Sequence, residues 1–295
     1  MMQVAHARLP VVFLALLVAG AASAKDSCPR FFAPGGPPSM TNPKLAADAV
    51  PLCYGAFAVL YSGVSRTPLY AGERLTRASV AAARSVERAD AFHEETRLPE
   101  NERASLSDYT HSGYDRGHMA PAGDMPTPDA QAESFTLANI VPQNRTVNRS
   151  LWAAIEESVR RLATRRGELF VVTGPIFSGK SIPSLDGRVL VPTQLYKAVY
   201  DPASGEAAAY LAPNDGEGEW QTVSIAALKD IAGLDAFPGL SDRDKRQAMR
   251  LPEPRAFSRD GGRSGREDAS LDSWLRNEAH RAFRRLWRNL MRSIF

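Results

Sequence analysis

The sequence predicts an α+β fold in which a mostly antiparallel central sheet is covered by a few packed helices. Three observations lead to this class. Several short stretches carry apolar residues in alternation or in continuous β-branched runs, turn residues separate neighbouring stretches, and one longer segment repeats apolar residues at helical spacing. Alternation with a period of two is typical of strands, whereas the longer period is typical of an amphipathic helix.

The first predicted strand pair lies near the N-terminus. Residues 55–63 read GAFAVLYSG, which places Phe57, Val59 and Tyr61 on one face of a strand. Residues 67–76, TPLYAGERLT, follow after a short turn. The two stretches therefore predict neighbouring antiparallel strands.

Three further strands and one helix complete the predicted core. Residues 167–177, GELFVVTGPIF, form a continuous apolar run, which predicts a buried central strand. Residues 192–201 and 206–214 predict another strand pair. Residues 148–167 predict an amphipathic helix that ends at a glycine, because apolar residues recur there at helical spacing: Leu151, Ile155, Val159 and Leu162.

Residues 1–24 have the pattern of a secretory signal. A basic start is followed by an apolar run over residues 11–22 and by Ala-Ser-Ala before Lys25. An uncleaved membrane anchor is the alternative, but the run is shorter than the ~20 residues that a spanning helix needs. We therefore expect an exported protein, periplasmic or secreted, from a bacterium.

Because the protein is expected to be exported, its two cysteines are expected to form a pair. Cys28 and Cys53 are the only cysteines, and an oxidising compartment allows two thiols to close into a disulfide. Such a bond would tether the Pro- and Gly-rich residues 29–43 to the first strand. The alternative is two free cysteines that are buried as small hydrophobic side chains.

We expect a core domain over residues 25–215 and a C-terminal extension over residues 216–295. The chain becomes Gly-rich and charged from about Asn214, and residues 252–268 have the composition of a linker. Residues 255–295 carry ten arginines and five acidic residues. Apolar residues recur there at helical spacing beside the arginines, which predicts a basic amphipathic helix.

Three interpretations of this basic helix stay open. It could pack on the core with its arginines in solvent, capture a polyanionic substrate, or contact an anionic membrane. The net charge of the whole chain, +3, is too small to indicate a nucleic-acid binder by itself. The oligomeric state is open as well, with a homodimer as one possibility.

Residues 114–124, YDRGHMAPAGD, contain a first cluster of chemically active side chains. Gly117 and Pro121 disfavour a regular helix, so His118 is expected at the end of a short strand that leads into a loop. Imidazole is the side chain that can accept a proton near neutral pH without special tuning. A buried, hydrogen-bonded structural histidine is the alternative.

Residues 137–158 contain a second cluster, at the start of the predicted helix. Asn148, Trp152 and Glu156 are spaced four residues apart and can share one side of a helix. An amide oxygen followed by a carboxylate could hold a hydrated Mg²⁺, with water in the remaining coordination positions. The alternative is an asparagine that caps the helix and a glutamate on its solvated face.

The two clusters together resemble the DNA/RNA non-specific endonucleases. The matching motifs are DRGHMAPAGD, the NIVPQ of residues 139–143, and then Asn148 and Glu156. This ββα-metal (His-Me finger) family includes secreted bacterial nucleases and mitochondrial endonuclease G. The resemblance extends more weakly from Cys28 to about Pro213, so it implies a nuclease domain over residues 25–215 with a ββα-metal motif.

The resemblance implies roles for individual residues. His118 would be the general base, and Asn148 would be the direct protein ligand of a single Mg²⁺, for which Mn²⁺ could substitute. Glu156 would orient water bound to the metal. Asn139 would support the geometry of the site.

Three charged residues complete the implied site. Arg116 and Asp115 flank the base within the same motif, and we expect Asp115 to be mainly structural. The family also has an arginine upstream, near the scissile phosphate. Arg88, followed by Phe92, matches this arginine loosely, and Arg84 is its nearest rival.

The implied reaction is phosphodiester hydrolysis with 5′-phosphate products. DNA and RNA are both expected as substrates, because the scheme contacts phosphate, sugar and water but no base edges. Activity should fall below about pH 6, where an ordinary imidazole is protonated. The alternative functions are a non-catalytic nucleic-acid binder and a membrane-surface protein that uses the basic C-terminal helix.

Overall fold

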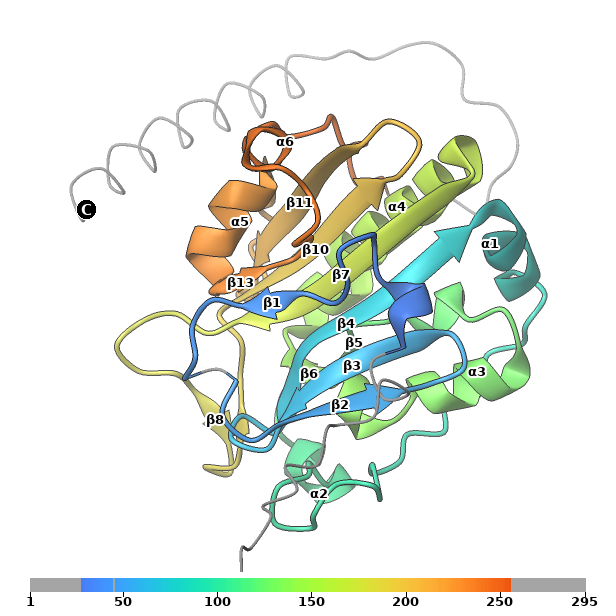
Figure 1. Ribbon diagram of the computed structural model, residues 1–295. Helices are drawn as coiled ribbons and strands as arrows, with labels where there is room; N and C mark the ends of the chain where they lie inside the picture. Colours follow the sequence, from blue (N-terminus) through green and yellow to red (C-terminus); the bar gives the residue numbers. More distant parts are fainter. Residues whose placement is uncertain (1–27, 45, 256–295) are drawn as a thin grey trace, which may run out of the picture. The chain divides into compact units, whose positions relative to one another are not determined.

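The computed structural model describes residues 28–44 and 46–255, and these residues contain one large antiparallel sheet (Figure 1). Seven strands pair in the order β12-β11-β10-β7-β4-β3-β2, all of them antiparallel. Their bounds are β2 (Ala49–Cys53), β3 (Phe57–Ser62), β4 (Thr67–Thr76), β7 (Glu168–Ile176), β10 (Gln194–Asp201), β11 (Glu206–Pro213) and β12 (Gln221–Val223). The expected α+β class is confirmed.

The strands predicted from the sequence are the central strands of this sheet. Phe57, Val59 and Tyr61 of β3 are all buried in one core, as their alternation predicts. β3 pairs with β4, and β10 pairs with β11, as expected. β7 lies in the middle of the sheet with β4 and β10 as its neighbours, which explains its continuous apolar sequence.

Smaller elements complete the described fold. Three further ladders have two strands each: β1 (Ser39–Met40) with β13 (Leu234–Asp235), β5 (Asp115–His118) with β6 (Ile140–Gln143), and β8 (Ser184–Leu185) with β9 (Val189–Leu190). The α-helices are α1 (Arg77–Ala83), α2 (Leu106–Tyr109), α3 (Pro128–Ser134), α4 (Ala153–Arg166), α5 (Ile225–Ala232) and α6 (Asp242–Arg246). Three short 3₁₀ turns are η1 (Pro29–Phe31), η2 (Ala122–Asp124) and η3 (Leu137–Asn139), and η4 (Val147–Trp152) is a π-helical turn.

The sheet separates two hydrophobic cores. One core contains Trp152, Ile155 and Val159 from η4 and α4, packed against one face of the sheet. The other contains Ile225 and Leu228 from α5, packed against the opposite face. Figure 1 shows α5 and α6 in front of the sheet and α4 behind it. The helix expected over residues 148–167 is therefore present, although it begins as a π turn.

The boundary expected after residue 215 falls inside the folded unit. β12 extends the sheet beside β11, and β13 pairs with β1 from the start of the chain. Ile225 and Leu228 are fully buried, so α5 belongs to the core. The composition from about Asn214 is Gly-rich because it forms a loop before β12, and the compact unit continues to the end of the described residues.

Two predicted segments lie outside the described residues. These are the secretory signal of residues 1–24 and the basic amphipathic helix of the C-terminal extension. Among the residues that are described, no helix has the length and the apolar character required to traverse a bilayer.

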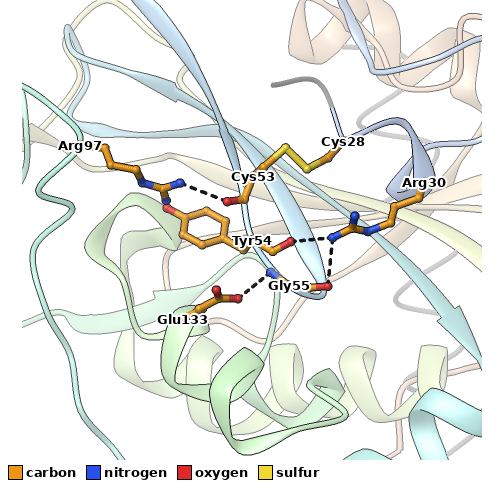
Figure 2. Close-up of a disulfide and its surroundings, with 7 residues drawn as sticks. All are labelled: Cys28, Arg30, Cys53, Tyr54, Gly55, Arg97 and Glu133. Atoms are coloured by element: carbon orange, nitrogen blue, oxygen red, sulfur yellow. Dashed lines mark hydrogen bonds between the residues drawn. A yellow bond between two sulfur atoms is a disulfide. The ribbon is translucent and has the colours of Figure 1, made fainter. Parts of the chain in front are cut away.

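The predicted disulfide between Cys28 and Cys53 is confirmed (Figure 2). The two Cα atoms lie 5.9 Å apart, and the bond joins the start of η1 to the end of β2. Nearby, Arg30 donates hydrogen bonds to the backbone oxygens of Tyr54 and Gly55, at 3.2 and 3.4 Å. The N-terminal segment is therefore fixed to the edge of the sheet by a covalent bond and by hydrogen bonds.

Replacing both cysteines, as Cys28→Ser with Cys53→Ser, is expected to lower the free energy of unfolding by roughly 3 kcal/mol, because the bond restricts the unfolded chain over a loop of this length. Urea unfolding of the oxidised protein and of the double variant measures the difference. Reduced wild type is the matched control and should unfold with the variant. Equal midpoints for the oxidised protein and the variant would contradict a stabilising role.

Candidate active site

His118 ends strand β5 and lies in an aromatic setting. Its side chain is buried, with only 8% of the residue surface exposed. The imidazole packs against the rings of Phe92 and Phe135, with centroids 5.4 and 5.0 Å away. The guanidinium of Arg116 covers the Phe92 ring at 4.3 Å. Arg116 itself is exposed, so the histidine is flanked by a cation on the solvent side of the aromatic cluster.

The environment of His118 keeps its imidazole neutral. Burial and, to a smaller extent, the positive charge of Arg88 lower the pKa of His118 to about 3, against the opposing effect of Asp90. The Nε2 atom is buried and has no hydrogen-bond partner among the described residues. A neutral imidazole with an unpartnered nitrogen is suited to accept a proton. The expected fall of activity below pH 6 assumed an ordinary imidazole pKa, and burial moves this titration to more acidic pH.

Arg88 is electrostatically linked to both ends of the site. Its charge lowers the pKa of His118 and also that of Glu156. The guanidinium lies 5.3 Å from the ring of Phe135 and donates a hydrogen bond to Asp90 at 2.7 Å. Arg84 instead caps the C-terminal end of α1. This placement favours Arg88 as the arginine that would meet a phosphate.

Asn139 fixes the loop that follows His118. Its side-chain oxygen accepts a hydrogen bond from the Ala120 N–H at 2.9 Å. Its side-chain nitrogen donates to the backbone oxygens of Ala120 and Ser134, at 2.8 and 2.9 Å. Asn139 is fully buried, and its hydrogen bonds join the loop after His118 to the last residue of α3.

Asn148 is held in one orientation by Asp115, the first residue of β5. The Asn148 Nδ2 atom donates a hydrogen bond to Asp115 Oδ2 at 3.0 Å. A carboxylate can only accept, so the amide nitrogen must face it. The amide oxygen of Asn148 is then the atom left to bind a cation. Because Asp115 lies three residues before His118 in the same strand, this hydrogen bond connects the strand that carries His118 to the turn that carries Asn148.

The hairpin and the helix that follows form the ββα arrangement. β5 pairs with β6, and the π turn η4 then leads into α4. π turns are frequent at functional sites. Gly117 is required in β5 because a Cβ there would lie 2.1 Å from the side-chain oxygen of Gln143. Trp152, which was expected beside Asn148 and Glu156, is 1% exposed and belongs to the core.

Asp124, the last residue of the DRGHMAPAGD motif, forms an ion pair with helix α4. Its carboxylate accepts a hydrogen bond from Arg160 Nη1 at 2.8 Å, and Arg160 also donates to Glu157 at 2.9 Å. Asp124 is buried at the end of η2, whereas Arg160 belongs to α4. This ion pair connects the loop after His118 to the helix that carries Glu156.

A second ion pair, between Lys197 and Glu73, is buried in the core and interacts electrostatically with Glu156. Lys197 of β10 donates to Thr173 at 2.7 Å and lies 3.6 Å from the carboxylate of Glu73 on β4. Lys197 and Glu73 are each 1% exposed. Burial raises the pKa of Glu156 to about 7, and Lys197 and Arg160 oppose this rise. The sequence analysis missed this pair, although a lysine and a glutamate inside predicted buried strands were a signal for it.

The donor atoms at this site are compatible with Mg²⁺. The described residues contain no group of three or more His, Cys, Asp or Glu side chains able to hold a metal ion. Mg²⁺ usually retains several waters and takes few protein oxygens, so one amide oxygen with a nearby carboxylate is a suitable donor set. Asn148 would supply the amide oxygen from η4, and Glu156 would supply the carboxylate from α4.

Comparison with known proteins agrees with this arrangement. The family model described as DNA/RNA non-specific endonuclease matches residues 37–243. A nuclease of Syncephalastrum racemosum is 36% identical over 212 residues, which are 63% of this chain and 66% of that protein. The mitochondrial nuclease EXOG of Danio rerio is 36% identical over 202 residues, 61% of this chain and 58% of that protein. A nuclease of Nostoc is 31% identical over 224 residues, 70% of this chain and 80% of that protein.

A solved structure shows the same architecture. The crystal structure of the EndoG/EndoGI complex, which concerns EndoG inhibition, has a chain that superposes with a TM-score of 0.61 at 28% identity. The match covers 66% of this chain and 88% of that chain. With the ββα arrangement at His118, these findings define the fold of a ββα-metal nuclease. The chain belongs to the DNA/RNA non-specific endonuclease family, and it spans slightly less than two thirds of the length of the first relatives it matches.

Proposed function

We propose that this protein is an endonuclease that uses Mg²⁺ to hydrolyse phosphodiester bonds of DNA and RNA, leaving 5′ phosphates. The observation that carries the proposal is the placement of two site residues on strand β5, which pairs with β6. A buried neutral histidine and the carboxylate that orients Asn148 stand three residues apart on β5. The family is one of metal-dependent nucleases, and Mn²⁺ can substitute for Mg²⁺ by the same oxygen-ligand chemistry.

Each side chain has a distinct part in the reaction. His118 accepts a proton from the water that attacks phosphorus, and its neutral state makes it competent at pH 7. Arg88 binds the charge that accumulates on the phosphoryl oxygens. Asn148 would be the direct protein ligand of the cation, Glu156 would orient water bound to it, and Asp115 orients Asn148. A bound Mg²⁺ would supply positive charge that neutralises a non-bridging oxygen and the leaving 3′ oxygen.

This scheme does not read nucleotide sequence. Every group in it addresses phosphate or water, and contacts of that kind carry little base information. DNA and RNA are therefore both accepted as substrates, in single-stranded or duplex form. Export to the periplasm or the medium is part of the proposal and is compatible with the disulfide. The matched relatives include mitochondrial nucleases as well as a nuclease of Nostoc.

Plasmid cleavage tests the proposal. Wild type is expected to nick and then degrade plasmid DNA and RNA with Mg²⁺ and to be inactive in EDTA. Asn148→Ala removes the amide oxygen, so the Mg²⁺ concentration for half-maximal activity should rise at least about tenfold. The matched control is Asn101→Ala, which removes an exposed amide outside the site and should leave that concentration unchanged. Cleavage by wild type in EDTA at the Mg²⁺ rate would overturn the metal requirement.

A further inference from the structure

Two exposed arginines flank the asparagine proposed to hold the metal. Arg145 follows strand β6, and Arg149 comes directly after Asn148 in η4. The side chain of Arg145 is 60% exposed and that of Arg149 is 70% exposed. Neither was a candidate in the sequence analysis, because the sequence pattern of this segment singles out only its amides.

One carboxylate orients both arginines. Arg149 donates to Asp115 through Nε at 2.7 Å and through Nη2 at 2.8 Å. Arg145 Nε lies 3.6 Å from the same carboxylate. Two guanidinium groups share this single carboxylate, so the pair presents an excess of positive charge at the surface beside Asn148.

The pair keeps hydrogen-bonding capacity toward solvent. Arg149 uses only Nε and one edge of Nη2 on Asp115, so Nη1 and the remaining Nη2 hydrogen stay available. Guanidinium groups bind phosphate in the same fork geometry as carboxylate. Exposed ion pairs contribute little to folding, so stability alone does not account for two arginines collected on one carboxylate.

We propose that Arg145 and Arg149 together bind a backbone phosphate that neighbours the scissile one, on the Asn148 side of the site. The proposal rests on the function proposed above. Asp115 connects the two sites because the same carboxylate holds Asn148, and His118 follows three residues later in β5. A substrate with only one phosphate would occupy the reacting position and leave the arginine pair without a ligand.

Binding of single-stranded oligonucleotides of increasing length tests this assignment. Fluorescence anisotropy in EDTA, with His118→Ala present in every protein, measures affinity without cleavage. Arg145→Ala with Arg149→Ala should weaken binding of a strand of about twelve nucleotides by tenfold or more, and should leave a dinucleotide unaffected. For the longer strand, the logarithm of the association constant falls linearly with the logarithm of salt concentration. The slope of this line should become shallower by about 0.7 for each phosphate that the variant no longer neutralises.

The matched control is the pair Arg243→Ala with Arg246→Ala. Both arginines are exposed on α6, which lies beside α5 on the opposite side of the sheet from α4 (Figure 1). This variant should bind both oligonucleotides as the parent protein does. Equal weakening by the control pair, equal weakening for the dinucleotide, or no weakening at all would each overturn the assignment.

A readout with His118 intact distinguishes a binding role from a structural one. If Arg145 and Arg149 acted only through Asn148, their removal would raise the Mg²⁺ concentration for half-maximal cleavage of a short substrate. We expect this concentration to stay within about twofold of wild type. Arg149→Lys, which keeps the charge and loses the fork, should bind the longer strand with intermediate affinity. Because affinity is measured without turnover, a wild type that never cuts would defeat the proposed function and still allow this site to be tested.

Discussion

His118→Ala is expected to reduce the rate of plasmid cleavage by about 10²–10⁴-fold, the range that a positioned general base contributes. The variant loses the only group of the hairpin that accepts a proton in the proposed scheme, whereas Asn148 and Asp115 keep their hydrogen bond. Initial rates with Mg²⁺ at pH 7 measure the effect. A variant that cuts as fast as wild type would remove His118 from the mechanism.

The matched control is His111→Asn. His111 is exposed and has a φ of 57°, and asparagine tolerates that left-handed conformation better than alanine. This variant should cleave DNA at the wild-type rate. If both histidine variants lose activity to the same degree, the loss reflects folding and not the chemistry at His118.

Acid unfolding gives His118 an independent signature. Its folded pKa of about 3 lies below the usual 6.5 because of burial, so the unfolded chain takes up a proton first as pH falls. The stability contributed by the neutral side chain is complete above pH 6.5 and is lost as pH falls toward 3. Urea unfolding of His118→Ala should therefore depend less steeply on pH in this window than unfolding of wild type.

Lys197→Met is expected to lower the free energy of unfolding by about 3–5 kcal/mol at pH 9, the usual cost of leaving one charge of a buried pair without its partner. The affected charge is that of Glu73, which is 1% exposed and whose two oxygens have no hydrogen-bond partner within the described residues. Burial raises the pKa of Glu73 to about 8, so the cost should shrink toward pH 5, where the carboxyl holds a proton. Urea unfolding at both pH values checks this.

The double variant Glu73→Gln with Lys197→Met is the decisive comparison. It removes both charges, so it should recover most of the stability at pH 9. Lys180→Met, at an exposed position in the β7–β8 loop, controls for the loss of a lysine and should leave stability unchanged. If Lys197→Met unfolds at the wild-type urea concentration at pH 9, Lys197 does not stabilise the ionised carboxylate of Glu73.

The central strands were predictable because their physical causes are local. Phe57, Val59 and Tyr61 alternate along β3, and the apolar run of β7 matches a strand that is covered on both faces. Gly167 ends α4 with a positive φ of 95°, as its position after the helical repeat predicts. β12 and α5 were assigned to an extension because their burial depends on pairing with β11 and packing on a distant sheet face.

The candidate site residues could be singled out from the sequence, but their arrangement in space could not. The motifs singled out His118, Asn148 and Glu156, and the structure brings Asn148 to the strand of His118 through Asp115. The role of Asp115 as an anchor for arginines depends on hydrogen bonds across more than thirty residues, at 2.7 and 2.8 Å to Arg149. No pattern within one segment could indicate such an interaction.

By itself, the sequence determined the strand pairs, the helix that ends at Gly167 and the cysteine pair, and it singled out the candidate site residues, since each depends on spacing or residue type within short segments. Only the tertiary structure decided that Arg160 meets Asp124 and that Lys197 meets Glu73. It also decided that His118 is buried enough to stay neutral. The physical reason is that burial and electrostatic interaction depend on neighbours in space, and the fold draws those neighbours from distant parts of the chain.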